Sequence, residues 1–300
     1  MAGATHSGAA AQALLILGLA WAASVPALPL WQITGTSNRI MVLGSIHFLR
    51  AADYPLAPEI TAAFAGADVV VMEIDMDDLD PVSNARTVAA LARDKKGRTL
   101  PELLGPKAWR AASAQALGLG LDLKSMAPFE PWYAAIVVTQ QRLTQLGFDQ
   151  SLGVESKLTA DAKRLGKEIR GLETLESQLG ILDALSPEAQ RSFLQSTLDE
   201  ASEVGDTADA MIAHWKAGDV RALKADLLDN VRDQPELYRL LIVRRNEYFA
   251  RAIGRLQNDP KNYLIVVGAL HLVGPDSVLS MLARDGVRSI QIDGSPVDAD

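Results

Sequence analysis

Runs of apolar residues bounded by turn-forming residues lie near both ends of this 300-residue chain and predict β-strands. The run at 69–74 is almost continuous, which is typical of a strand covered on both faces. The tetrapeptide Gly35–Asn38 suits a hairpin turn between two of the runs. The predicted strands are Trp31–Ile33, Ile40–Ile46, Asp68–Asp75, Lys167–Gly171, Tyr263–Val267 and Val287–Ile292.

The middle of the chain, residues 83–256, has mainly helical periodicity. Two helix starts carry a capping hydroxyl group and then a proline in the first turn, at Thr99 and at Ser186. We therefore expect an α/β fold with a central sheet, mainly parallel or mixed, built from both chain ends, and a large helical insertion at about 83–256. The longest predicted helix is Asp233–Leu256, and shorter ones are Pro58–Ala65 and Pro275–Asp285.

The N-terminal segment predicts export. Ala9–Ala23 is apolar and uncharged, and the small residues Val25 and Ala27 resemble those before a signal-peptidase cleavage site. The expected organisation is a signal peptide at 1–27 and one α/β domain at 28–300, located in the periplasm or secreted. An uncleaved N-terminal anchor is the alternative, although the apolar stretch is shorter than the roughly 20 residues that span a bilayer. No later stretch predicts a transmembrane helix.

Composition excludes several functions. The formal net charge is −8 and no long basic run is present, which argues against a nucleic-acid partner. The absence of cysteine excludes disulfides, a thiolate nucleophile and thiolate metal ligands. A Gly-x-Ser-x-Gly elbow, a His-Glu-x-x-His helix and a phosphate-binding loop are also absent from the sequence.

Two of the four histidines stand in the same local pattern, three residues after a glycine that ends an apolar run. They are His47 after Gly44 and His271 after Gly268. Open α/β sheets place their chemistry just beyond the carboxyl ends of the strands, and imidazole is both a proton-transfer group and a common metal ligand. This pairing predicts a shared cleft.

Glu73 closes a strand of apolar residues, where an unpaired carboxylate costs several kcal/mol. Together with His47 and His271, it would supply the two-histidine and carboxylate set that a divalent cation such as Mn, Co or Zn requires. A structural salt bridge of Glu73 is the alternative. Asp75 lies on the same strand face and is better explained as structural, and His214, beside Trp215, as a packed or surface residue.

The chain resembles the TraB/GumN/Tiki family, which belongs to a wider group with the erythromycin-esterase-like and ChaN-like proteins. The resemblance extends over nearly the whole chain after residue 27 and depends on the order of several short motifs. These are Leu28–Trp31, Gly44–His47, the strand ending at Glu73, Gly153–Glu155, Leu172–Thr174 with Gln178, Arg245–Asn246 and Val267–Leu272.

The resemblance implies a metal-dependent hydrolase, because Tiki members are described as membrane-tethered metalloproteases that use the two Gly-x-x-His motifs and a glutamate. It marks His47, Glu73 and His271 as metal positions. It also implies catalytic or supporting roles for Glu73, Glu155, Arg245 and Asn246. Arg245 could hold a substrate carboxylate or oxyanion, or could be a helix-surface arginine. Glu155 and Glu173 could instead brace neighbouring helices.

Two functions remain open from the sequence. The first is an exported metal-dependent hydrolase of peptide or ester bonds with a peptide or small-molecule substrate. The second is a non-catalytic module that captures a peptide or haem in the same cleft. Neither the substrate nor the oligomeric state follows from the sequence.

Overall fold

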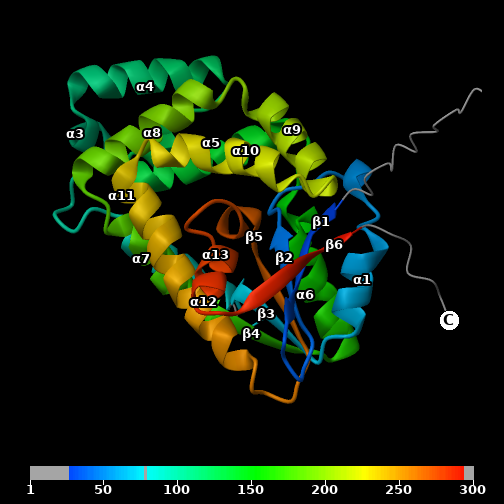
Figure 1. The fold of residues 1–300 in the computed structure, drawn as a ribbon. Helices are drawn as coiled ribbons and strands as arrows, with labels where there is room; N and C mark the ends of the chain where they lie inside the picture. The colour runs from blue at the N-terminus through cyan, green and yellow to red at the C-terminus, as the bar shows by residue number, and fades with distance from the viewer. Residues whose placement is uncertain (1–26, 78–79, 294–300) are drawn as a thin grey trace, which may run out of the picture.

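A computed structural model describes residues 27–77 and 80–293. A six-stranded mixed sheet in the order β4-β3-β5-β2-β1-β6 forms its centre, as predicted (Figure 1). Strands β2 to β5 run parallel, and β1 pairs antiparallel with both β2 and β6. The strands are β1 (Ala27–Thr34), β2 (Ile40–Ser45), β3 (Val69–Ile74), β4 (Glu168–Glu173), β5 (Tyr263–Gly268) and β6 (Arg288–Asp293).

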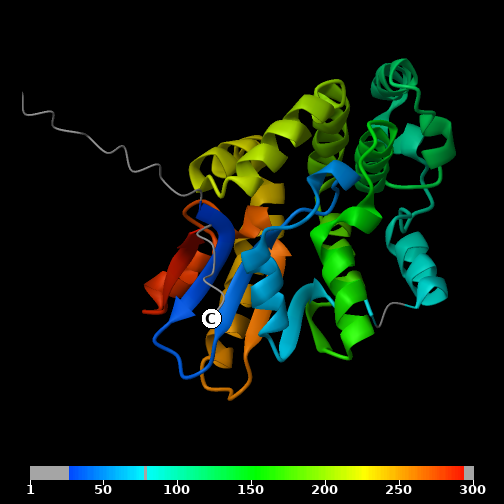
Figure 2. The ribbon, with the colours of Figure 1, turned by 90° about the vertical axis from the view of Figure 1, so that its right-hand side faces the viewer.

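Helices cover both faces of the sheet and its upper end in Figures 1 and 2. The shorter ones are α1 (Pro58–Ala65), α3 (Leu100–Leu104), α7 (Leu175–Asp183), α11 (Pro235–Tyr238) and α13 (Val278–Arg284). The longer ones are α2 (Pro81–Leu91), α4 (Pro106–Gly118), α5 (Pro131–Gln145), α6 (Val154–Leu165), α8 (Pro187–Glu200), α9 (Val204–Lys216), α10 (Val220–Arg232) and α12 (Arg244–Leu256).

Alternating side chains of the central strands fill two separate cores. On β5, Leu264 and Val266 pack toward α1, α6 and α9, whereas Ile265 and Val267 pack toward α12 and α13. A strand that is apolar on both faces must be covered on both, and the run at 69–74 was predicted to be such a strand. The first and last strands lie side by side, which brings both ends of the described chain together.

The helical region of the sequence is divided by a strand. β4 joins the sheet beside β3, so the helices form two stretches, at 81–165 and at 175–256. Helices α3, α4, α5 and α8 enclose a core of their own. Together with α9 and α10 these helices form a helical layer, of which α5, α9 and α10 lie above the carboxyl ends of the parallel strands (Figure 1). The helical region is therefore placed where it can roof a site at that edge.

Two predicted helix boundaries change in the structure. The helix expected at 233–256 begins at Pro235 and contains a π-helical turn, Arg239–Val243, between α11 and α12. The helix expected from Pro275 begins at Val278, because the Ser277 side chain accepts the Ser280 N–H and caps it there.

The predicted signal peptide lies outside the described residues, apart from Ala27, which begins β1. Within 27–77 and 80–293, no helix combines the length and the hydropathy needed to cross a membrane.

Candidate functional site at the carboxyl edge of the sheet

The two histidines predicted to meet do lie at the same edge. β2 and β5 are parallel neighbours with Ser45 opposite Gly268, so His47 and His271 follow adjacent strands. β3 is the other neighbour of β5 and carries Glu73. Parallel pairing of segments from the two chain ends is therefore what assembles the site.

A cavity of about 420 Å³ opens at this edge. Its floor carries polar side chains from the strand ends and the adjoining helices, and its roof comes from the helical layer. The polar lining residues are Ser45, His47, Glu73, Gln178, Arg245 and His271.

His47 and Glu155 form an ion pair at the cavity. His47 Nδ1 lies 2.9 Å from Glu155 Oε1, and the Ser45 hydroxyl donates to the same oxygen. The imidazole remains 60% exposed, whereas the carboxylate is buried. The negative charge of Glu155 raises the pKa of His47 to about 9, so the imidazole is protonated at neutral pH. Glu155 Oε2 is buried and has no hydrogen-bond partner among the described residues.

The position of Glu155 depends on Gly153, at the start of α6. A Cβ atom at Gly153 would lie 2.1 Å from the His47 carbonyl oxygen. Only glycine permits this approach without a backbone shift, and the approach delivers the first turn of α6 to His47. The Gly-Val-Glu motif is therefore explained by packing as well as by chemistry.

Arg245 joins two buried carboxylates. Its Nη2 donates to Glu73 Oε2 at 2.6 Å and also to Glu173 Oε1, and its Nε donates to Glu173 Oε2 at 3.2 Å. Gln178 Nε2 donates to the same carboxylates, at 3.2 Å to Glu73 and 3.0 Å to Glu173. The Gly268 N–H donates to the remaining Glu73 oxygen at 2.7 Å. Glu73 thus forms a buried ion pair with Arg245.

The ionisation of these carboxyl groups follows from their surroundings. Burial raises the pKa of a carboxyl group, but in Glu73 it is outweighed by two positive charges, that of His271 at pH values below its own pKa and that of Arg245, which together lower the pKa to about 2. Burial raises the pKa of Glu173 despite its contacts with Arg245. Glu73 is therefore an ionised, fixed anion at neutral pH, and Glu173 is the more easily protonated of the two.

His271 is fully enclosed and neutral. Burial lowers its pKa to about 4. Its Nδ1 lies 2.6 Å from Asn246 Oδ1, and Asn246 Nδ2 donates to the Asp276 carbonyl oxygen at 2.7 Å. Because that amide donates to a carbonyl, its oxygen faces the imidazole, and His271 carries its proton on Nδ1. His271 Nε2 then accepts a hydrogen bond from Arg245 Nη1 at 3.0 Å.

The predicted three-ligand metal set does not fit this arrangement of side chains. Across the described part of the chain, no group of three His, Asp or Glu side chains is placed to hold one ion. Arg245 is the physical reason, because its guanidinium engages both Glu73 and the Nε2 atom of His271. Arg245 supplies the positive charge beside Glu73 in this structure.

The structure brings together every residue that the sequence and the resemblance assigned to the site, and it separates two others. Asp75 accepts the backbone N–H of Asp77, and His214 pairs with Asp226 at 2.6 Å, as expected of structural residues. Ser45 was missed as a partner of Glu155, although it precedes His47 by two residues in the same motif.

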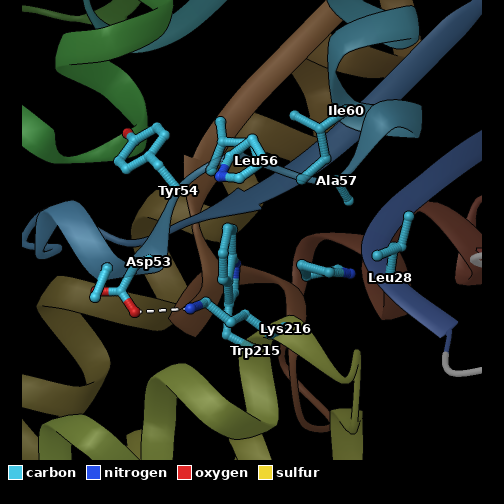
Figure 3. Close-up of a pocket in the computed structure, with 11 residues that line it drawn as sticks. Leu28, Asp53, Tyr54, Leu56, Ala57, Ile60, Trp215 and Lys216 are labelled. Atoms are coloured by element: carbon cyan, nitrogen blue, oxygen red, sulfur yellow. Dashed lines mark hydrogen bonds and ion pairs between the residues drawn. The ribbon is translucent and has the colours of Figure 1, made fainter.

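A second hollow, of about 290 Å³, contains none of the predicted site residues (Figure 3). The Lys216–Asp53 ion pair, at 2.7 Å, and the Trp215 ring line it. Trp215 also donates its Nε1–H to the Gly44 carbonyl oxygen at 2.6 Å. This hollow therefore lies behind a tryptophan that supports the strand end leading to His47.

Comparisons with known proteins place the chain in one family. The sequence profile of the TraB/PrgY/gumN family matches residues 29–289. The Escherichia coli K12 protein described as "Uncharacterized protein YbaP" is 27% identical over 85% of this chain and 92% of its own length. The Danio rerio proteins "Metalloprotease TIKI2" and "Metalloprotease TIKI1" are 26% and 23% identical over 82% and 81% of this chain. The matched segments cover only 57% and 59% of those two proteins, and no solved structure matches the chain.

Proposed function

This protein belongs to the TraB/PrgY/gumN family, and from that premise we propose that it is a hydrolase of peptide or ester bonds acting in the cavity at the carboxyl edge of the sheet. One observation carries the proposal: two histidines, buried carboxylates and an arginine from both chain ends converge on a single cavity. Relatives named as metalloproteases support hydrolysis as an activity within the family.

The His47–Glu155 pair is the group best placed for proton transfer. Its imidazole is exposed at the cavity and protonated at neutral pH, so it can donate a proton to the leaving nitrogen or oxygen of a substrate. Glu155 holds the ring through Nδ1, which leaves Nε2 for the substrate. Ser45 does not resemble the nucleophile of a catalytic triad, because its hydroxyl donates to Glu155 rather than to an imidazole.

Arg245 and Asn246 act as positioning residues in this proposal. All three nitrogens of the Arg245 guanidinium contact protein partners, so this residue fixes Glu73, Glu173 and His271 relative to one another. Asn246 fixes the tautomer and the orientation of His271. The fixed polar floor can orient a scissile carbonyl group without reorganising when the substrate binds.

The names of the TIKI relatives suggest at most a metal dependence for this chain. Binding of a divalent cation by His47, Glu73 and His271 would require Arg245 to release Glu73 and His271. The metal set therefore stays a prediction, and metal analysis of the purified protein together with activity before and after chelation tests it. Full turnover by metal-free protein would refute metal dependence and leave the hydrolase proposal in place.

Turnover of a panel of peptides and 4-nitrophenyl esters tests the hydrolase proposal. We expect His47→Ala and Glu155→Gln to lose roughly 10²-fold or more in kcat, the usual contribution of a positioned acid or base. His214→Ala is the matched control and should keep wild-type turnover. Equal turnover in the wild type, His47→Ala and Glu155→Gln would refute the proposal. Ligand binding without any product would instead support the non-catalytic module.

Export is part of the proposal and rests on the sequence of residues 1–27. Expression of the full chain in a bacterial host, followed by fractionation and N-terminal sequencing, tests it. An N-terminus near Leu28 in the periplasmic fraction is the expected result. Retention of Met1 in the membrane fraction would favour the N-terminal anchor instead.

A further inference from the structure

The roof of the site cavity differs sharply in chemistry from its floor. The floor contains all the histidine, acidic and basic residues that line the cavity in the described part of the chain. Helices α5, α7, α9 and α10 contribute aliphatic side chains to the lining, which we call the roof, and Phe48 and Phe148 add two aromatic rings to the apolar part of the lining. Its principal side chains are Ile136, Leu143, Leu179, Leu182, Met211 and Leu227.

Most of these roof side chains are only half-buried, although they line an interior hollow. Leu182 is the buried exception among the six. Apolar surface that faces water in a concave site gains free energy when an apolar ligand covers it. The roof is therefore suited to the apolar part of a ligand, while the floor receives its polar part.

The size of the cavity limits the ligand. A cavity of about 150 Å³ holds benzene, which has six non-hydrogen atoms, so 420 Å³ has room for roughly 15 such atoms. A scissile carbonyl group and its immediate neighbours use a few of them. About ten atoms then remain for the part that contacts the roof.

We propose that the cavity selects substrates whose scissile carbonyl carries an aliphatic group of roughly six to ten carbons, a size scaled from the cavity volume. This inference rests on the proposed hydrolase function and names the substrate class of the same site. In the reaction, water adds to the carbonyl carbon and the bond to the leaving oxygen or nitrogen breaks. The leaving group takes a proton, and the product is a carboxylic acid.

This chemistry has two sources, a fatty acyl chain or neighbouring aliphatic side chains of a peptide. Two substrate series distinguish them. One is a set of 4-nitrophenyl esters from acetate to decanoate, and the other is a set of peptide nitroanilides carrying either aliphatic or acidic side chains. We expect kcat/KM to rise by about fourfold for each methylene added to the ester until the cavity is full, as methylene burial predicts. A rise with chain length in the ester series identifies a fatty acyl chain as the source. A preference for aliphatic over acidic side chains in the peptide series identifies a peptide.

Met211→Trp fills the roof without touching the polar floor. It should lower kcat/KM for decanoate at least tenfold more than kcat/KM for acetate. Leu227→Trp serves as a second roof variant if Met211→Trp does not fold. Leu117→Trp is the matched control, because Leu117 lies on α4 outside the cavity lining and is 69% exposed. A wild type indifferent both to ester chain length and to aliphatic against acidic peptide side chains, or an equal loss for acetate and decanoate in the roof variants, would overturn the inference.

A binding measurement separates failure of this inference from failure of the proposed function. Calorimetric titration with decanoate and with acetate needs no turnover. If no substrate is hydrolysed but decanoate binds to the wild type and not to Met211→Trp, the hydrolase proposal fails and the aliphatic site stands. If neither anion binds and neither series shows a preference for chain length, the aliphatic site is refuted.

Discussion

Substitution of Arg245 by methionine tests whether the cluster beneath the cavity is held together by this guanidinium. The side chain of Arg245 is 6% exposed, and those of its partners Glu73 and Glu173 are 10% and 8% exposed. Methionine preserves most of the length and removes the charge. Two carboxylates are then left in a buried place without their cation.

The expected loss is large. Removal of one partner of a buried ion pair costs about 3–5 kcal/mol of unfolding free energy, because the remaining charge is left uncompensated. Here two carboxylates lose the same partner, so we expect a value toward the upper end of that range. The partly exposed His214–Asp226 pair provides the comparison, since His214→Ala should cost less than about 1 kcal/mol.

The destabilisation caused by Arg245→Met should also depend on pH, which gives a second, independent test. Without Arg245, burial raises the folded-state pKa of Glu73 and Glu173 above its unfolded value. Each group then binds more protons in the folded than in the unfolded state. The destabilisation should therefore be full above the folded pKa and should shrink as the pH falls through it.

Urea unfolding followed by circular dichroism, at pH 7.5 and at pH 5, measures both effects. The double variant Arg245→Met/Glu73→Gln should be more stable than Arg245→Met alone, since one of the stranded charges is gone. A loss below about 1 kcal/mol, or a loss equal at both pH values, would refute the view that Arg245 is the counter-ion of a buried cluster.

Three further predictions concern the supports of the site. Burial holds the pKa of His271 at about 4, below the ordinary histidine value of 6.5, so the free energy of unfolding should fall as the pH drops from 6.5 to 4. The His271→Gln variant should lose that slope in urea titrations, and a slope equal to that of the wild type would contradict the assignment. Asn246→Asp should raise the pKa of His271, because a carboxylate at 2.6 Å favours imidazolium; NMR titration measures it, and an unchanged value counts against this contact. Gly153→Ala should cost about 1–3 kcal/mol in thermal unfolding, because its Cβ meets the His47 carbonyl oxygen; wild-type stability would show that the loop adjusts freely.

The sequence was sufficient to predict the sheet and the meeting of its two ends. Runs in which nearly every residue is apolar, without alternation, identify central strands. A glycine at the end of two such runs marks the positions after which His47 and His271 follow. Both features are local, so they can be read without knowing what lies across the cleft. The same reasoning found Glu73, because a carboxylate in an apolar strand needs a partner wherever the strand lies.

The identity of that partner could not be predicted, because it is set by contacts distant in sequence. Arg245 lies 172 residues from Glu73, on a helix whose phase shifts at the π-helical turn Arg239–Val243. Helical periodicity placed Arg245 equally well on the surface or in the site. Only the packing of α12 against the sheet shows that its guanidinium engages the atoms of Glu73 and His271 that the sequence assigned to a metal.

The roof of the cavity could not be predicted either, because its residues look ordinary in the sequence. Ile136, Leu179 and Met211 look like ordinary core positions of helices, and aliphatic residues facing a core or a ligand have the same periodicity. What distinguishes them is that they remain half-buried above a charged floor, which is a property of the assembled layers. In this fold, the chemistry is contributed by strand ends that the sequence identifies. The selectivity we propose is contributed by helices whose role appears only once they are placed over those strand ends.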